Sequence, residues 1–301
     1  MRKPTRTSRA SAVLLMVALA LLLGGACGQS PETKKQKALA RGEQYLKDGK
    51  VDEAIIEFRT ALQVDENFVP AVQGLGRAYV AKSWHGDAAR EFQRAKKLSP
   101  DSLPIAVDFG RVLVQLGAWK EAEEQAAVIL STEPRNQDGL YIRSAALLGQ
   151  GKPQEVLSLL GPLPPGESSP DLGRIVALAL FRSGKVVEAE QAFRATLAKN
   201  PQDAQSLVGL GSIQLAQNRP TEALKLFEQA KAITPADPKA RQGVALAQAQ
   251  LGHLPQAITE LEGIDRRAWS SDTVTTLSVF YMRANRAGDA IRLLAPVVER
   301  L

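Results

Sequence analysis

The chain has few of the residue types on which much protein chemistry depends. Cys27 is its single cysteine, it has two histidines, and aromatic residues make up 5% of the sequence. One thiol excludes an internal disulfide bond and a zinc site built from several cysteines. His85 and His253 lie in separate segments that we expect to be turns, and two dispersed imidazoles do not make a metal site. We therefore expect no metal and no cofactor.

The sequence also lacks a motif that indicates an enzyme. Gly-Leu-Gly occurs at 74–76 and at 209–211, but neither copy has the third glycine of a dinucleotide-binding fingerprint. Serine, histidine and aspartate occur in no arrangement that suggests a catalytic triad. We expect no catalytic residues, and we interpret the two Gly-Leu-Gly stretches as places where helices pack closely.

The positive net charge is concentrated at one end of the chain. The formal charge is +6, and Arg2, Lys3, Arg6 and Arg9 lie in the first 26 residues, which contain no acidic residue. The remainder has 34 basic and 32 acidic residues. Nucleic-acid binding is typical of domains with a basic face, so the nearly balanced remainder does not favour a nucleic-acid partner.

Residues 1–26 have the form of a secretory signal peptide. A basic segment is followed by an apolar run over 12–23, by small residues over 24–26 and then by Cys27. The apolar run is too short to cross a membrane, because a spanning helix needs about 20 residues. We therefore predict that the protein is exported.

The position of Cys27 resembles the lipobox of bacterial lipoproteins. The resemblance implies that Cys27 becomes the first residue of the mature chain and carries lipid on its sulfur. The family favours leucine three residues before the cysteine, whereas Gly24 stands there and Leu23 lies one position further back. Gly24 and Ala26 also suit signal peptidase I, which would cut at the same bond and leave an unmodified, secreted protein.

The residues after Cys27 bear on the membrane that would hold the protein. Residues 28–34 contain no large apolar residue, and we interpret residues 27–34 as the lipidated cysteine and a polar tether. In enteric lipoproteins an aspartate after the cysteine often marks retention in the inner membrane, and Gly28 stands there in this chain. The resemblance therefore implies an outer-membrane anchor facing the periplasm.

From about residue 35 the chain repeats itself every 33 or 34 residues. A small apolar residue recurs at Ala54, Ala88, Ala122, Val156, Ala189, Ala223, Ala257 and Ala290, and a small residue precedes each by twelve positions, at Gly42, Gly76, Gly110, Ser144, Ala177, Gly211, Ala245 and Ser278. Between the two stand Gly49, Ser83, Gly117, Gly151, Gly184, Asn218, Gly252 and Asn285. Glycine and asparagine suit the left-handed conformation that ends a helix. The pattern predicts two helices per repeat with a turn at each of these residues.

A larger residue follows each recurring alanine by four positions. These are Phe58, Phe92, Ala126, Leu160, Phe193, Phe227, Leu261 and Leu294, with alanine as the exception in the third repeat. We expect them to fill the space between the helices of one repeat and the next. The small residues allow the backbones of neighbouring helices to approach, which a larger side chain would prevent.

This period and pattern resemble the tetratricopeptide repeat (TPR), a helix–turn–helix unit. The repeats begin near residues 35, 69, 103, 137, 170, 204, 238 and 271. The resemblance implies an all-α, right-handed α-solenoid of about eight repeats over residues 35–301. The Pro-rich stretch 161–170 and the stretch 262–271 depart from the family pattern, and we expect irregularities there.

The family also indicates where a ligand would bind. Its concave groove is lined by positions 2, 5, 9, 12 and 13 of each repeat. Position five gives Leu39, Gln73, Val107, Tyr141, Arg174, Val208, Gln242 and Thr275, and position nine gives Glu43, Arg77, Arg111, Ala145, Leu178, Ser212, Leu246 and Val279. We predict a site at Gln73, Arg77, Arg111, Tyr141, Arg174, Phe181 and Arg182. Arginines with aromatic residues would suit an extended acidic peptide or an anionic polysaccharide. The alternative is a solvated face with scattered arginines.

The last repeat offers a second candidate surface. Ile291, Leu294, Val297 and Val298 would lie at an open end of the array, where terminal repeats normally carry a polar face. Either the chain is a fragment of a longer array, or this end contacts a partner.

Two classes of function remain open from the sequence. The first is a membrane-anchored scaffold for protein–protein interaction in the bacterial cell envelope. It is similar to TPR lipoproteins of exopolysaccharide export, pilus assembly or exosortase-type (PEP-CTERM) protein sorting, most of all the last. The second is a targeting module of a longer chain with a catalytic domain beyond residue 301.

Overall fold

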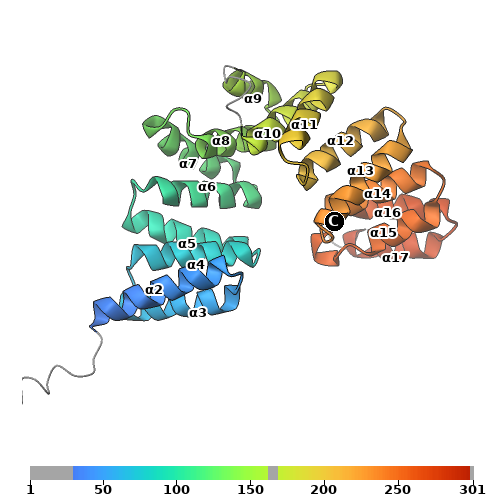
Figure 1. The fold of residues 1–301 in the computed structure, drawn as a ribbon. Coiled ribbons are helices and arrows are strands. Elements are labelled where there is room, and N and C mark those ends of the chain that lie inside the picture. The colour runs from blue at the N-terminus through green and yellow to red at the C-terminus, as the bar shows by residue number, and fades with distance from the viewer. Residues whose placement is uncertain (1–29, 162–168, 299–301) are drawn as a thin grey trace, which may run out of the picture. The chain divides into compact units, whose positions relative to one another are not determined.

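The computed structural model describes residues 30–161 and 169–298, and all regular secondary structure within them is helical (Figure 1). These ranges contain sixteen α-helices and one short 3-10 helix, η1 (Arg266–Ala268), without a strand. The helices are α2 (Pro31–Lys47), α3 (Val51–Val64), α4 (Val69–Ala81), α5 (His85–Leu98), α6 (Leu103–Leu116), α7 (Trp119–Thr132), α8 (Gln137–Gly149), α9 (Pro153–Leu160), α10 (Pro170–Arg182), α11 (Val186–Lys199), α12 (Ala204–Ala216), α13 (Pro220–Ile233), α14 (Pro238–Gln250), α15 (Leu254–Glu262), α16 (Ser271–Arg283) and α17 (Ala287–Val298). The predicted all-α fold is confirmed.

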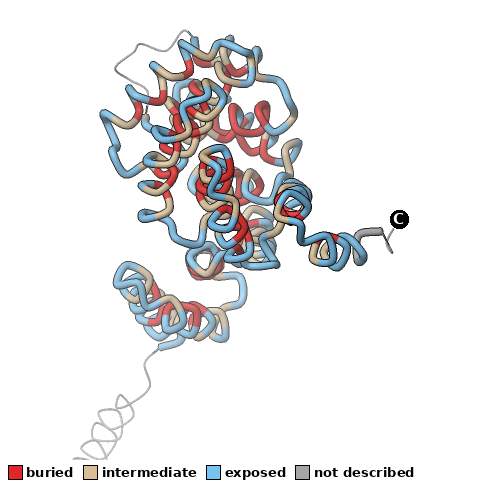
Figure 2. The backbone as a smooth tube through the Cα atoms, turned by 90° about the vertical axis from the view of Figure 1, so that its right-hand side faces the viewer, coloured by how far each residue is buried: buried red, intermediate tan, exposed pale blue. Residues whose placement is uncertain are grey.

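The chain divides into two compact units, one up to Leu116 and one from Gly117 onward. In the first unit α2 packs against α3, and α4 packs against α5. In the second unit α10 pairs with α11, α12 with α13, α14 with α15 and α16 with α17. Along the helices, buried stretches alternate with exposed ones (Figure 2). Each unit is therefore built from consecutive helix pairs with one buried face, as in an α-solenoid.

The first helix begins earlier than the sequence pattern suggests. The Ser30 hydroxyl accepts a hydrogen bond from the Thr33 backbone N–H at 3.2 Å, and Pro31 occupies the first helical position. Proline suits this position because its missing N–H would have no partner within the helix. The expected tether over 27–34 is thus wrong for residues 31–34, which form the first turn of α2.

The eight residues that were expected to end the first helix of each repeat adopt a common backbone conformation. Gly49, Ser83, Gly117, Gly151, Gly184, Asn218, Gly252 and Asn285 all have positive φ values, between 57° and 87°. Elsewhere in the described residues no non-glycine residue has a positive φ. The predicted turns are confirmed at every repeat, because a left-handed residue is what reverses the chain between paired helices.

The large residues of the second helices pack directly on the glycines of the first helices. A Cβ placed on Gly42 would stand 2.6 Å from the Phe58 ring, and one placed on Gly74 would stand 2.5 Å from the same ring. Gly76 approaches Phe92 and Gly209 approaches Phe193 in the same way. The interpretation of both Gly-Leu-Gly stretches as packing glycines is therefore confirmed.

The two irregular repeats have short second helices. Helix α9 ends at Leu160 and α15 at Glu262, before the 3-10 helix η1. After η1 the Trp269 indole N–H donates to the Ile264 carbonyl oxygen at 2.9 Å, and its ring packs against the core around α16. Trp119 packs against Gly149, where a Cβ would stand 2.4 Å from the indole. Trp119 and Trp269 therefore serve packing.

Candidate protein-binding groove

In the first unit the predicted groove residues converge on an acid that the sequence analysis did not single out. Asp108 of α6 accepts hydrogen bonds at 2.7 Å from the Gln73 side-chain amide and from Nε of Arg77, both on α4. Arg111 and Tyr141 also have interaction partners within the protein. Asp108 stands at position six of its repeat, beside the positions expected to line the groove. It offsets the charge of Arg77, so this surface is less basic than the sequence suggests.

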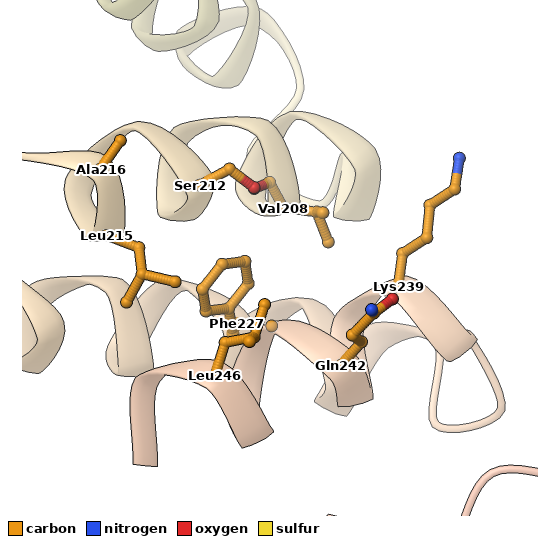
Figure 3. Close-up of a pocket in the computed structure, with 9 residues that line it drawn as sticks. Val208, Ser212, Leu215, Ala216, Phe227, Lys239, Gln242 and Leu246 are labelled. Carbon is orange, nitrogen blue, oxygen red and sulfur yellow. The ribbon is translucent and has the colours of Figure 1, made fainter. Parts of the chain in front are cut away.

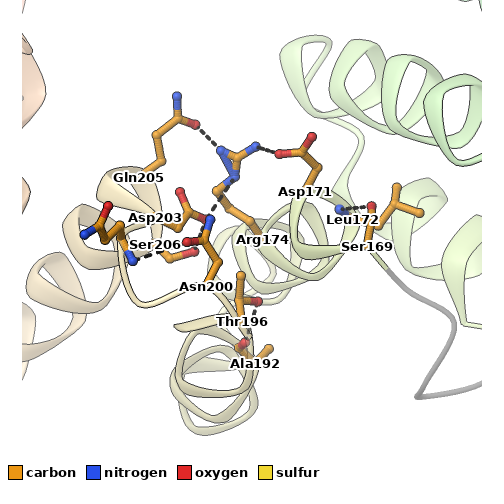
Figure 4. A network of polar contacts seen from close by, with 11 residues as sticks. Ser169, Asp171, Leu172, Arg174, Ala192, Thr196, Asn200, Asp203, Gln205 and Ser206 are labelled. Atoms are coloured by element: carbon orange, nitrogen blue, oxygen red, sulfur yellow. Dashed lines mark hydrogen bonds and ion pairs between the residues drawn. The ribbon is translucent and has the colours of Figure 1, made fainter. Parts of the chain in front are cut away.

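The second unit places Arg174 inside the protein rather than on a ligand-binding face (Figure 4). Arg174 is only 7% exposed. Its guanidinium donates to Asp171 at 2.7 Å and to the Gln205 side-chain oxygen at 2.5 Å, and Nε lies 3.7 Å from Asp203. Arg174 therefore links α10 to the beginning of α12. The prediction that Arg174 is accessible to a ligand in the groove is wrong, because Asp203 and Gln205 of the neighbouring repeat bind its guanidinium.

The remaining predicted residues of α10 are also engaged. Nη1 of Arg182 donates to the Leu148 carbonyl oxygen at 2.6 Å, in the last turn of α8. A cation at this end of a helix is favourable, because the last carbonyl groups have no partner within the helix. Phe181 packs against the core formed by Ala177, Ala189 and Phe193. The binding role of this set stays a prediction, and its arginines hold neighbouring helices together.

A cavity opens instead between α12 and α14 (Figure 3). It has a volume of about 500 Å³ and is lined by Val208, Ser212, Leu215, Ala216, Phe227, Lys239, Gln242, Gly243 and Leu246. The α12 residues stand at positions 5, 9, 12 and 13 of their repeat, and Lys239, Gln242 and Leu246 stand at positions 2, 5 and 9 of the next. These are the positions that line the groove in the family.

Sequence reasoning named some of these positions but did not choose them as the site. The signal that was available is their apolar character, since Val208, Leu215 and Leu246 stand where a solvated face would carry polar residues. Leu246 remains 36% exposed. A contiguous exposed apolar patch is one mark of a binding site.

A second hollow lies over α16 and α17. It measures about 450 Å³ and is lined by Thr275, Ser278, Val279, Met282, Arg283, Ala290, Ile291 and Leu294. Ile291 and Leu294 are exposed. The side chains of Val297 and Val298 lie outside the described residues.

The described part of the chain holds no cluster of His, Cys, Asp and Glu side chains that could bind a metal ion. It also contains no helix that is long and apolar enough to cross a membrane. The predicted signal peptide over 1–26 and the candidate lipidation site Cys27 lie outside the described residues. What the described surface offers is a groove lined by apolar and polar side chains.

Comparison with known proteins identifies the repeat. Two tetratricopeptide repeat family models match residues 177–238 and 214–268. Residues 177–268 thus match the tetratricopeptide repeat. A solved TPR protein from Parabacteroides merdae matches with a TM-score of 0.66 and 13% identity, over 83% of this chain and 99% of that one. At this identity the likeness shows the fold alone.

Relatives by sequence match shorter parts of much longer proteins. Superkiller complex protein 3 of Homo sapiens is 31% identical over 38% of this chain and 7% of its own length. Cellulose synthase 1 operon protein C of Komagataeibacter xylinus is 22% identical over 66% of this chain and 13% of its own length. The chain thus spans a small part of these relatives. TPR repeats are typical of scaffolds that bind other proteins.

Proposed function

We propose that this TPR protein is an exported scaffold, anchored by lipid on Cys27, that binds a protein partner in the bacterial cell envelope and serves exopolysaccharide export. The observation that carries the proposal is the position of Cys27. It follows a signal-peptide-like leader and precedes the start of α2 at Pro31 by four positions. The TPR units would begin almost at the membrane surface.

The energetics of acylation support a stable anchor. Burial of an acyl chain contributes about 0.8 kcal/mol per CH₂ group, and stable attachment generally needs two membrane signals. A diacylated cysteine supplies two chains. Because Ser30 and Pro31 already belong to the start of α2, the anchor would hold the first repeat close to the lipid headgroups.

The assignment to exopolysaccharide export is supported by one relative. The name of the Komagataeibacter xylinus protein places it in a cellulose synthase operon, and cellulose is a polysaccharide. The matched segment is TPR sequence, so a shared role would lie in binding partner proteins rather than in catalysis. A role in exosortase-type protein sorting belongs to the same class of envelope scaffold.

The anchor is tested by expressing the chain from Met1 in a Gram-negative host, followed by fractionation and intact-mass analysis. We expect the wild type in the membrane fraction, cut before Cys27 and carrying acyl mass there. We expect the Cys27→Ala variant to leave the membrane fraction. Gly28→Asp is the matched control, and it should stay acylated but move from the outer to the inner membrane. An unmodified wild type in the periplasm would overturn the anchor.

The pathway needs a separate test in the organism's own envelope. We expect deletion of the gene to reduce extracellular polysaccharide and a wild-type copy to restore it. Unchanged polysaccharide together with mis-sorted envelope proteins would contradict exopolysaccharide export and favour protein sorting.

A further inference from the structure

We propose that the cavity between α12 and α14 binds a bulky apolar side chain of an extended partner segment, with a carboxylate of the same segment held by Lys239. The inference deepens the proposed function, since it rests on the scaffold role and names the chemistry of the partner. It does not depend on the lipid anchor or on the pathway.

The walls of the cavity suit an apolar side chain. Phe227 forms its floor between the two helices, and Val208, Leu215 and Leu246 surround it (Figure 3). Its volume of about 500 Å³ falls within the range of small ligand sites. A buried apolar anchor at the centre of an interface contributes much of the binding free energy.

Some polar side chains of the cavity already have a hydrogen-bond partner within the protein, and others have none among the described residues. The Ser212 hydroxyl donates to the Val208 carbonyl oxygen at 2.8 Å within α12, so it is satisfied. Across the described residues, the Gln242 amide and the Lys239 ammonium make no hydrogen bond or ion pair. A side-chain amide can donate to and accept from the backbone of an extended segment. Gln242 is thus placed to orient such a segment along the cavity.

Lys239 differs from nearby cations because its charge has no carboxylate partner. Lys231 pairs with Glu228 and Glu260, and Arg241 also pairs with Glu260. Lys239 is exposed at the edge of an apolar cavity. A carboxylate brought there would interact with it more strongly than on an open surface, because apolar walls lower the local dielectric constant. Charge complementarity therefore favours an acidic segment over a neutral or basic one.

The spacing of the groove residues sets the spacing in the partner. Lys239 and Leu246 are seven positions apart on α14, which corresponds to about 10 Å along the helix axis. Two residues of an extended chain span about 7 Å and point to the same side. The flexible lysine side chain covers the remaining distance. We therefore expect the carboxylate two residues from the apolar anchor.

The test uses dye-labelled peptides and the full-length chain in detergent, with binding followed by fluorescence anisotropy. The probe is GSDSFSDSG, and its controls are GSDSASDSG without the anchor and GSKSFSKSG with reversed charge. We expect the wild type to bind the probe at least tenfold more tightly than either control. No saturable binding of the probe up to about 1 mM would overturn the proposal.

Two variants assign the binding to this cavity. We expect Leu246→Asp to weaken binding of the probe at least tenfold, whereas Val187→Asp, an exposed apolar position on α11, leaves it unchanged. We expect Lys239→Glu to reverse the preference toward the lysine peptide, whereas Lys225→Glu on α13 keeps it. Circular dichroism checks that every variant is folded.

Other outcomes would contradict the proposal in distinct ways. If the Lys239→Glu variant kept the preference for the acidic peptide, Lys239 would not be the group that binds the carboxylate. Self-association of the chain that disappears in Leu246→Asp would assign the cavity to a second copy. Neither result would affect the test of the lipid anchor, which measures fractionation and mass.

Discussion

A Cβ atom placed on Gly243 would stand 2.3 Å from Cδ1 of Phe227. The same ring lies against Gly211, where the distance would be 2.8 Å. Phe227 of α13 is thus enclosed by the helix before it and the helix after it. This contact joins two repeats and also forms the floor of the cavity between α12 and α14. Phe227 therefore contributes both to the packing of two repeats and to the lining of the candidate site.

The contact predicts the effect of a single methyl group. We expect Gly243→Ala to lower the free energy of unfolding by about 1–3 kcal/mol, because the added carbon forces the ring or the backbone to move. Gly288→Ala in α17 is the matched control, since nothing lies within 4 Å of its Cβ position. Denaturant unfolding measures both, and an equal effect of the two substitutions would contradict the packing argument.

A second glycine prediction isolates backbone conformation. Gly49 has a φ of 73° and open space around its Cβ position, so no clash contributes to a substitution there. We expect Gly49→Ala to destabilise the protein by about 1–2 kcal/mol through the left-handed conformation alone. Gly86→Ala, equally open but within α5, should instead be neutral or stabilising by up to about 1 kcal/mol. Denaturant unfolding measures both variants, and we expect Gly49→Ala to be less stable than Gly86→Ala by at least about 1 kcal/mol.

The Arg174 network predicts a loss of stability rather than a loss of binding. In Arg174→Ala, Asp203 and the Gln205 side-chain oxygen lose a partner, and we expect destabilisation of about 1–3 kcal/mol, as for part-buried acceptors left unsatisfied. Arg194→Ala removes an exposed pair with Glu190 and should change the unfolding free energy by less than about 1 kcal/mol. If Arg174→Ala were as stable as Arg194→Ala, the interpretation of Arg174 as a buried link would be wrong.

Tyr281 predicts a defined dependence of stability on pH. Burial of its phenol, together with its hydrogen bond to Glu262 at 2.7 Å, raises the pKa of Tyr281 from 10.0 to about 12. The pKa of Tyr281 is higher in the folded protein than in the unfolded chain. The phenol therefore stabilises the fold below pH 10, and this contribution to the free energy of unfolding is lost as the pH rises toward about 12. We expect the stability difference between wild type and Tyr281→Phe to change across this window. A constant difference would contradict the shift, and the absorbance of tyrosinate follows the titration directly.

The predicted site shows where sequence reasoning stops. The groove positions follow from the repeat period, so Arg77 and Arg174 could be placed on first helices. Their partners could not, since Asp108 and Gln205 come from the following repeat and lie about 31 positions away in the sequence. Whether an arginine is available to a ligand depends on such partners.

By itself the sequence determined the features that are local and periodic. The helix pairs, the left-handed turn residues from Gly49 to Asn285 and the small residues under each aromatic ring all follow from steric rules that act over a few residues. The tertiary structure alone decided which groove charges are offset and where the cavity beside Lys239 opens. Those properties arise where side chains from successive repeats meet, and a spacing pattern contains no information about how such side chains pair.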